Sequence, residues 1–155
     1  MKLRTLLFAV MAVTFSVVAT GAETPKRGGT LNFAVSAEPP NYDCHANSSF
    51  AFIHPVRPHY STLLKFDPDN YPKIIGDLAE SWTIASDGLT YTFKLKKGVK
   101  FHDGSTLTSE DVKASYDRIR DPQGGAKSLR KAAYDDITAI DTPDPYTVVV
   151  KLKKP

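Results

Sequence analysis

The chain has 155 residues, of which 20 are lysine or arginine and 17 are aspartate or glutamate, so its formal net charge is +3. This near balance excludes a protein built to neutralise nucleic-acid phosphates, and a single cysteine excludes an internal disulfide framework. The length suffices for one modest domain, whose stability must then come from its hydrophobic core.

The N-terminal stretch has the organisation of a cleavable secretory signal peptide. Lys2 and Arg4 supply a positive start, residues 6–18 are almost all apolar, and small residues follow them. The apolar run is shorter than the roughly 20 residues that a membrane-spanning helix needs. We therefore expect a signal peptide over residues 1–22, and a mature net charge of about +1, because two positive charges leave with it.

The position of Cys44 indicates whether the exported protein is anchored to a membrane by a lipid. Bacterial lipoproteins carry a cysteine at the cleavage point, whereas Cys44 lies well beyond it. We therefore expect a freely soluble periplasmic protein without a lipid anchor.

Hydrophobic periodicity predicts strands interleaved with helices, and therefore an α/β or α+β domain over residues 23–155. Apolar side chains alternate with smaller or polar ones over residues 31–35, which is typical of a strand. Two prolines then predict a loop over residues 37–43. A helix is expected over residues 54–64, with its prolines in the first turns, where a missing N–H costs little.

The clearest pattern lies between residues 79 and 104. Apolar residues recur at every second position over residues 82–84 and again over residues 91–95, and the segment 86–89 between them contains a glycine. This arrangement predicts a β-hairpin with one buried face. We expect the aromatic residues of this region to lie in the core: Trp82, Tyr91, Phe93 and Phe101.

A short strand over residues 99–101 should lead into a turn at His102-Asp103-Gly104. We expect Asp103 to bond nearby backbone and Gly104 to adopt positive φ, rather than a catalytic His–Asp pair. Thr108 should cap a helix, because acidic residues fill the first turn that follows it. The remaining predicted elements are a short helix over residues 128–134 and two strands over residues 137–140 and 146–152.

Five stretches of the chain together form a recognisable pattern: Gly28-Gly29-Thr30-Leu31, Ala79-Glu80-Ser81-Trp82, residues 91–104, residues 107–112 and residues 146–152. They resemble the family 5 extracellular solute-binding proteins of bacterial ABC importers, which bind dipeptides, oligopeptides or nickel. The resemblance covers nearly all of the expected mature chain, and its most specific part fixes many residue types at fixed spacing over residues 79–104.

The resemblance implies a two-lobed periplasmic-binding-protein fold (type II-like), of which this chain contains only the N-terminal part of the first lobe. The lobes of such proteins close over a solute by a hinge motion, and the protein then delivers the solute to an inner-membrane ABC permease. The resemblance further implies a monomer at full length, without cofactor or enzymatic activity. Peptides are the expected solutes, although relatives also carry nickel, haem, sugars or opines.

A candidate ligand-binding loop follows the first predicted strand. Ligands of open α/β sheets favour loops beyond the carboxyl ends of strands, and in oligopeptide-binding relatives the matching segment lies at the interlobe cleft. Glu38 would pair with a positive group of the ligand, and free backbone would bond an extended peptide. The alternative is an ordinary proline-rich surface loop. The candidate residues are Ser36, Ala37, Glu38, Pro39 and Asn41.

Other constellations indicate no catalytic or metal site. The spacing of the cysteine and the histidines matches no compact metal motif, and no nucleophile elbow or phosphate loop is present in the sequence. Two rival functions stay open: a secreted sensor or chaperone-like binding protein on the same fold, and a secreted enzyme. The residues weighed were Cys44, His45, His54 and His59 for a metal, and Glu110-Asp111 and Asp135-Asp136 for acid–base catalysis.

Overall fold

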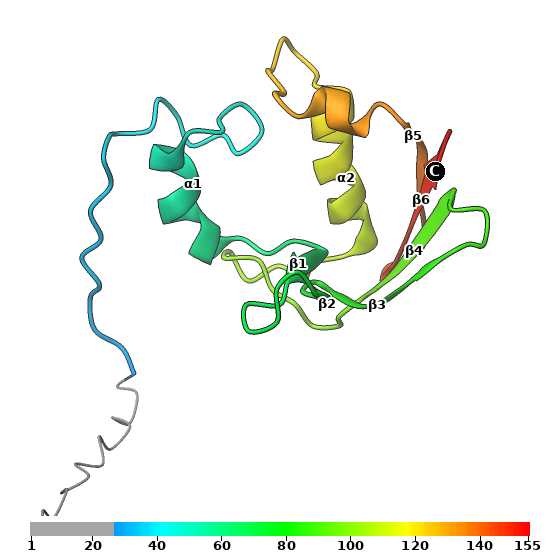
Figure 1. The fold of residues 1–155 in the computed structure, drawn as a ribbon, viewed down its shortest axis with the longest axis horizontal. Coiled ribbons are helices and arrows are strands. Elements are labelled where there is room, and N and C mark those ends of the chain that lie inside the picture. Colours follow the sequence, from blue (N-terminus) through cyan, green and yellow to red (C-terminus); the bar gives the residue numbers. More distant parts are fainter. Residues whose placement is uncertain (1–26) are drawn as a thin grey trace, which may run out of the picture. The chain divides into compact units, whose positions relative to one another are not determined.

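The computed structural model describes residues 27–155, so the expected signal peptide over residues 1–22 lies outside the described residues. The chain divides into two units between Asn32 and Phe33. Residues 27–32 of the first unit contain no helix or strand, and the helices and strands of Figure 1 all belong to the second unit. Across residues 27–155, no helix has the length and apolar character required to span a membrane.

The second unit contains a four-stranded sheet and a two-stranded sheet, and all neighbouring strands in both sheets are antiparallel. Two α-helices and two short 3-10 helices accompany them. In chain order the elements are α1 Phe50–Val56, η1 Arg57–His59, β1 Leu64–Phe66, β2 Ile74–Gly76, β3 Ala79–Ile84, β4 Thr90–Leu95, α2 Ser109–Arg120, η2 Lys131–Tyr134, β5 Ile137–Asp144 and β6 Thr147–Leu152.

The larger sheet has the strand order β3-β4-β6-β5. Strands β3 and β4 form the hairpin that the sequence predicts, with Trp82 opposite Phe93. The two predicted C-terminal strands are also confirmed as β5 and β6. Strand β5 is longer than expected and continues through Pro143, which is tolerated because β5 lies at the edge of the sheet and a proline N atom has no ladder bond to donate there.

Helix α2 covers one face of this sheet (Figure 1). Core residues recur at every second position in β4 and β6, so that both strands turn the same face toward α2. The opposite face carries Thr92 and Lys94, and the Lys94 ammonium donates to the Thr147 hydroxyl at 2.7 Å. The buried core consists of Leu63, Ala79, Phe93, Leu95, Leu107, Val112, Ile140, Val148 and Val150.

The start of α2 confirms the predicted cap. The Thr108 N–H donates to an Asp111 carboxylate oxygen at 2.7 Å, and the two side chains form a capping box. Ser109 ties this end of the helix to the β5–β6 turn, because its hydroxyl donates to the Asp144 carbonyl at 2.6 Å. Local sequence chemistry therefore fixes where α2 begins, whereas a bond between residues 35 positions apart fixes where this end of α2 meets the sheet.

The predicted strand over residues 31–35 is wrong. These residues form no strand, and their apolar side chains are exposed: 89% for Leu31, 61% for Phe33 and 38% for Val35. Alternation specifies which face a strand would bury, but a strand also needs a partner for its backbone hydrogen bonds. No strand among residues 27–155 pairs with this segment.

The predicted helix over residues 54–64 is displaced toward the N-terminus. Helix α1 ends at Val56, η1 follows it, and Leu64 already belongs to β1. The physical reason is Pro58, which lacks the N–H that would continue the α-helical ladder to the His54 carbonyl. The chain therefore tightens into a 3-10 turn and then extends.

The segment after the hairpin contains two further corrections. Residues 99–101 form no strand, and Lys100 makes an isolated bridge with Thr106. The chain reverses too tightly for a longer ladder, since the Phe101 N–H donates to the Ser105 carbonyl at 2.9 Å. Phe101 is consequently 41% exposed and does not join the core. The predicted helix over residues 128–134 is reduced to the 3-10 helix η2.

Candidate functional site

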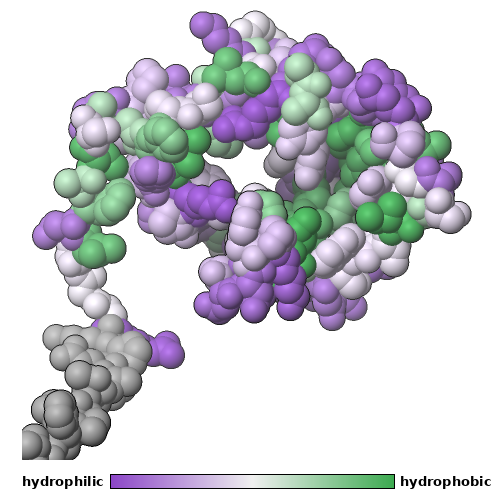
Figure 2. Space-filling view, in the orientation of Figure 1, coloured by the Kyte–Doolittle hydropathy of each residue, from purple (hydrophilic) through white to green (hydrophobic). Residues whose placement is uncertain are grey.

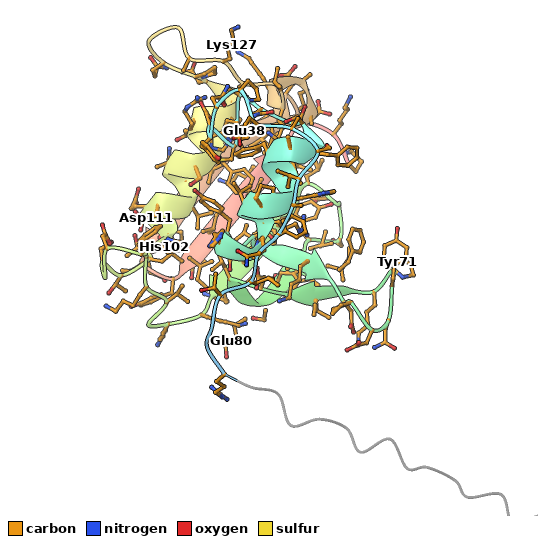
Figure 3. The ribbon with its side chains drawn as sticks, turned by 90° about the vertical axis from the view of Figure 1, so that its left-hand side faces the viewer. Glu38, Tyr71, Glu80, His102, Asp111 and Lys127 are labelled. Carbon is orange, nitrogen blue, oxygen red and sulfur yellow. The ribbon has the colours of Figure 1, made fainter. Side chains whose placement is uncertain are left out.

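The candidate segment, residues 36–41, is irregular and accessible. Ser36, Ala37, Glu38 and Asn41 are exposed and Pro39 is half-buried. Within the described part of the chain, the N–H groups of residues 36–38 and the carbonyls of residues 36–40 have no hydrogen-bond partner, and Pro39 and Pro40 have no N–H. In Figure 3, Glu38 lies in the upper part of the view, below Lys127, and Glu80 lies at the lower edge of the ribbon. Because the preceding strand does not form, the candidate segment does not lie at the end of a strand, and that argument for a binding site fails. The side chains and backbone of the segment are nevertheless accessible to a ligand.

Asn41 anchors one end of the candidate segment. The Asp43 N–H donates to the Asn41 side-chain oxygen at 3.1 Å, which closes a side-chain turn. The buried Asn47 amide donates in turn to the Asn41 carbonyl at 3.0 Å. Asn41 is therefore bonded through both its side chain and its backbone to the loop that follows.

That loop, residues 43–47, is organised around the Asp43 carboxylate. One oxygen accepts the His45 N–H at 2.8 Å and the Ala46 N–H at 3.3 Å, and the other accepts from Arg118 at 2.8 Å. The pKa of Asp43 is held below its ordinary value, first by the His45 N–H and further by the Ala46 N–H and the Arg118 charge, although burial opposes them. Asp43 therefore stays ionised and links the loop to α2.

A second arginine holds the same loop from the C-terminal side of α2. The Arg130 guanidinium donates to the carbonyls of Cys44 and Asn47, and the Leu129 N–H donates to the His45 carbonyl at 3.0 Å. His45 lies among these cations. Burial lowers the pKa of His45, and the positive charges of both arginines lower it further, against the opposing charge of Asp43.

An open hollow of about 680 Å³ lies beside the C-terminal half of α2, but its charged groups already bond one another. Asp117 accepts from Lys113 and from Arg120, and Asp121 accepts from the Gln123 amide. A ligand would have to displace these bonds, so we do not assign the hollow as the site. Its lining comprises Ala114, Asp117, Arg118, Arg120, Asp121, Gln123, Tyr134, Asp135 and Ile137.

The turn at His102-Asp103-Gly104 has the structure that the sequence predicts. Asp103 accepts the Ser105 N–H at 2.9 Å and the Ser105 hydroxyl at 2.7 Å, and Gly104 has a φ of 88°. The Ser105 hydroxyl and then its N–H lower the pKa of Asp103. The carboxylate is thus engaged in forming the turn.

The metal hypothesis gains no geometric support. Among residues 27–155, no three histidine, cysteine, aspartate or glutamate side chains lie close enough together to hold one ion. Cys44 is exposed, and the His54 ring packs at 5.1 Å between centroids against Phe50.

Sequence reasoning missed Arg118 and Arg130 as partners of the candidate region. The spacing of Asn41 and Asp43 does signal a side-chain turn, and this signal is local. The arginines lie 75 and 86 residues away from the groups that they bond. A single sequence contains no periodicity or motif that links positions so far apart.

Comparison with known proteins identifies the class. Residues 73–155, just over half of the chain, match the bacterial extracellular solute-binding proteins, family 5 Middle. This stretch contains the whole four-stranded sheet and α2. The chain therefore belongs to the family 5 bacterial extracellular solute-binding proteins, as its sequence resemblance predicts.

Individual relatives agree with this assignment. Di/tripeptide-binding protein 2 of Pseudomonas aeruginosa is 32% identical over 97% of this chain and 30% of its own length. The crystal structure of Haemophilus influenzae OppA in complex with RPPGFSPFR is 25% identical, with a TM-score of 0.68, over 77% of this chain and 26% of that one. NikZ from Campylobacter jejuni, in complex with Ni(L-His), is 34% identical with a TM-score of 0.56, over 62% of this chain and 19% of that one.

These likenesses confirm the predicted fold class for the part of the chain that they cover. The chain spans less than a third of the length of each of these relatives.

Proposed function

We propose that this chain forms part of a solute-binding component of an ABC importer, which captures a peptide in the periplasm and delivers it to an inner-membrane permease. The observation that carries the proposal is the family match over residues 73–155. The choice of peptide is supported by the di/tripeptide-binding relative, whose similarity extends over 97% of the chain and therefore includes the candidate segment.

We propose that the candidate segment contacts the solute through Ser36, Ala37, Glu38, Pro39 and Asn41. Two features support this role. The Glu38 carboxylate is exposed and can pair with the amino group of a peptide, and the backbone of residues 36–40 has free groups that can bond an extended chain. The anchored Asn41 lowers the entropy that binding must remove at that end of the segment.

We propose that residues 1–22 are removed during export and that the mature protein is soluble, monomeric and without a lipid anchor. The sequence pattern of a positive start, an apolar run and small residues supports cleavage. The position of Cys44, beyond the cleavage region, supports the absence of an anchor.

Native mass spectrometry of the protein purified from its own periplasm tests these proposals together. We expect a mass that lacks residues 1–22 and a co-purifying peptide that is released unchanged. A chemically converted substrate would instead favour a secreted enzyme. If the purified protein binds peptide but cells that lack it still take up peptide, a sensor or chaperone-like role is favoured.

Replacement of Glu38 tests the segment itself. In the protein produced from its own gene, we expect Glu38→Gln to weaken tri-alanine binding by roughly tenfold, since a lost charge-assisted hydrogen bond costs about 1.5 kcal/mol or more. Glu80→Gln is the matched control, because Glu80 is also exposed but lies far below Glu38 in the view of Figure 3. Equal dissociation constants for the two variants, measured calorimetrically, would refute the assignment of Glu38.

A further inference from the structure

The region that contains α1 and loop 43–47 lies outside the hydrophobic core. The core cluster starts at Leu63, whereas the buried Phe52 of α1 packs edge-on against Tyr42, with ring centroids 6.3 Å apart. Figure 2 shows an opening through the second unit, between its α1 side and its α2 side. Apolar packing between the two helices therefore does not fix the position of loop 43–47.

Polar contacts from Arg118 instead fix the position of loop 43–47. One end of its guanidinium donates to the Asp43 carboxylate at 2.8 Å, and the other donates to the Lys127 carbonyl at 3.1 Å. A single rigid, planar group on α2 therefore holds loop 43–47 and the segment beyond α2 at the same time. Arg130 adds bonds to the carbonyls of the same loop.

The contact continues into the candidate segment. Asp43 donates its N–H to the side chain of Asn41, and Asn47 at the other end of the loop donates to the Asn41 carbonyl. Any shift of Asp43 relative to α2 must therefore change the geometry at Asn41.

We infer that Arg118 is a positioning residue for solute binding: it sets the conformation of residues 36–41 from α2, through the Asp43 carboxylate, without contacting the solute. This inference rests on the proposed role of the candidate segment. It deepens that proposal by naming the group that orients the segment.

The exposure of the ion pair distinguishes this role from a contribution to overall stability. The Arg118 and Asp43 side chains are 29% and 39% exposed, and pairs of this kind contribute little to the free energy of global unfolding. Removal of the pair should instead release loop 43–47 locally, because residues outside the core open independently of global unfolding.

Two substitutions isolate the contact in the protein produced from its own gene. Asp43→Asn keeps the oxygen that accepts from His45 and Ala46 but removes the negative partner of Arg118. Arg118→Gln removes the cation. Arg120→Gln is the control, because Arg120 lies on the same helix but bonds Asp117 and the Ile137 carbonyl instead of the loop.

The readouts are amide hydrogen exchange of residues 36–47 without ligand, tri-alanine affinity, and the urea midpoint of unfolding. We expect Asp43→Asn and Arg118→Gln each to speed exchange and weaken affinity two- to fivefold, at a urea midpoint equal to that of Arg120→Gln. The double variant should be no worse than either single variant, because both remove the same interaction.

Unchanged exchange in Arg118→Gln, or additive effects in the double variant, would overturn the inference. The outcome for the proposed function is separate. If the unsubstituted protein fails to bind tri-alanine, or if Glu38→Gln binds normally, the solute-binding role of the segment fails, while the exchange data still decide whether Arg118 holds it.

Discussion

Gly76 provides a sharp test of the packing between the two sheets. It is the last residue of β2, and the chain then reverses so that the Asp77 and Ala79 N–H groups both donate to the Leu63 carbonyl, at 3.0 and 3.1 Å. A Cβ atom added at Gly76 would lie 2.2 Å from the Ala79 carbonyl oxygen. Ala79 is fully buried in the core and cannot move away.

The cost of Gly76→Ala follows from this distance. Non-bonded Cβ contacts shorter than 3.0 Å essentially do not occur, so the backbone must shift by most of an ångström. Overpacking of this kind costs about 1–3 kcal/mol. With a urea dependence of about 2 kcal/mol per molar, the midpoint of unfolding should fall by about 1 M.

Gly98 is the matched control, because glycine is required at this position by the backbone conformation and not by a close neighbour. Its φ is +75°, and a Cβ added there would have no heavy atom within 4 Å. Gly98→Ala should cost about 1–2 kcal/mol through backbone strain alone, and Gly98→Asn should recover part of it, since asparagine tolerates this conformation. Gly76→Asn should recover nothing. A wild-type urea midpoint for Gly76→Ala, or equal rescue by asparagine at both positions, would refute the steric argument.

Three further predictions concern titration and the core. The pKa of His45 is lowered in the folded protein, so the unfolded chain binds more protons and stability should fall as the pH drops through and below about 6.5. His45→Gln should flatten this fall in urea titrations. Burial and Tyr134 raise the pKa of Tyr116 to about 12, so stability should decline between about pH 10 and 12, and less steeply in Tyr116→Phe. Leu95 is 2% exposed, so Leu95→Ala should cost about 2–5 kcal/mol in chemical denaturation, and a loss under 1 kcal/mol would contradict its place in the core.

The elements that the sequence predicts correctly are those fixed by local chemistry. The β3–β4 hairpin follows from period-two alternation around a glycine turn, and the start of α2 follows from the Thr108 cap. The strand expected over residues 31–35 shows the limit of this reasoning. Its alternation is real, but pairing depends on a distant strand, which local sequence does not supply.

The candidate site shows the same limit. Exposure of Glu38 and the turn at Asn41 follow from residues that lie within a few positions of one another. The ion pair of Asp43 with Arg118 joins positions 75 residues apart, and no motif in a single sequence predicts it. The family could be named from the sequence because its motif at residues 79–104 is long, whereas the orientation of the loop required the structure.

The two edge strands of the larger sheet also affect how the protein behaves among its own copies. Both carry a register shift, between Ala79 and Ser81 in β3 and between Asp141 and Asp144 in β5, and β5 adds Pro143. An interrupted edge offers another chain no continuous ladder of N–H and C=O groups. Copies of this sheet are thereby less prone to join edge to edge and aggregate.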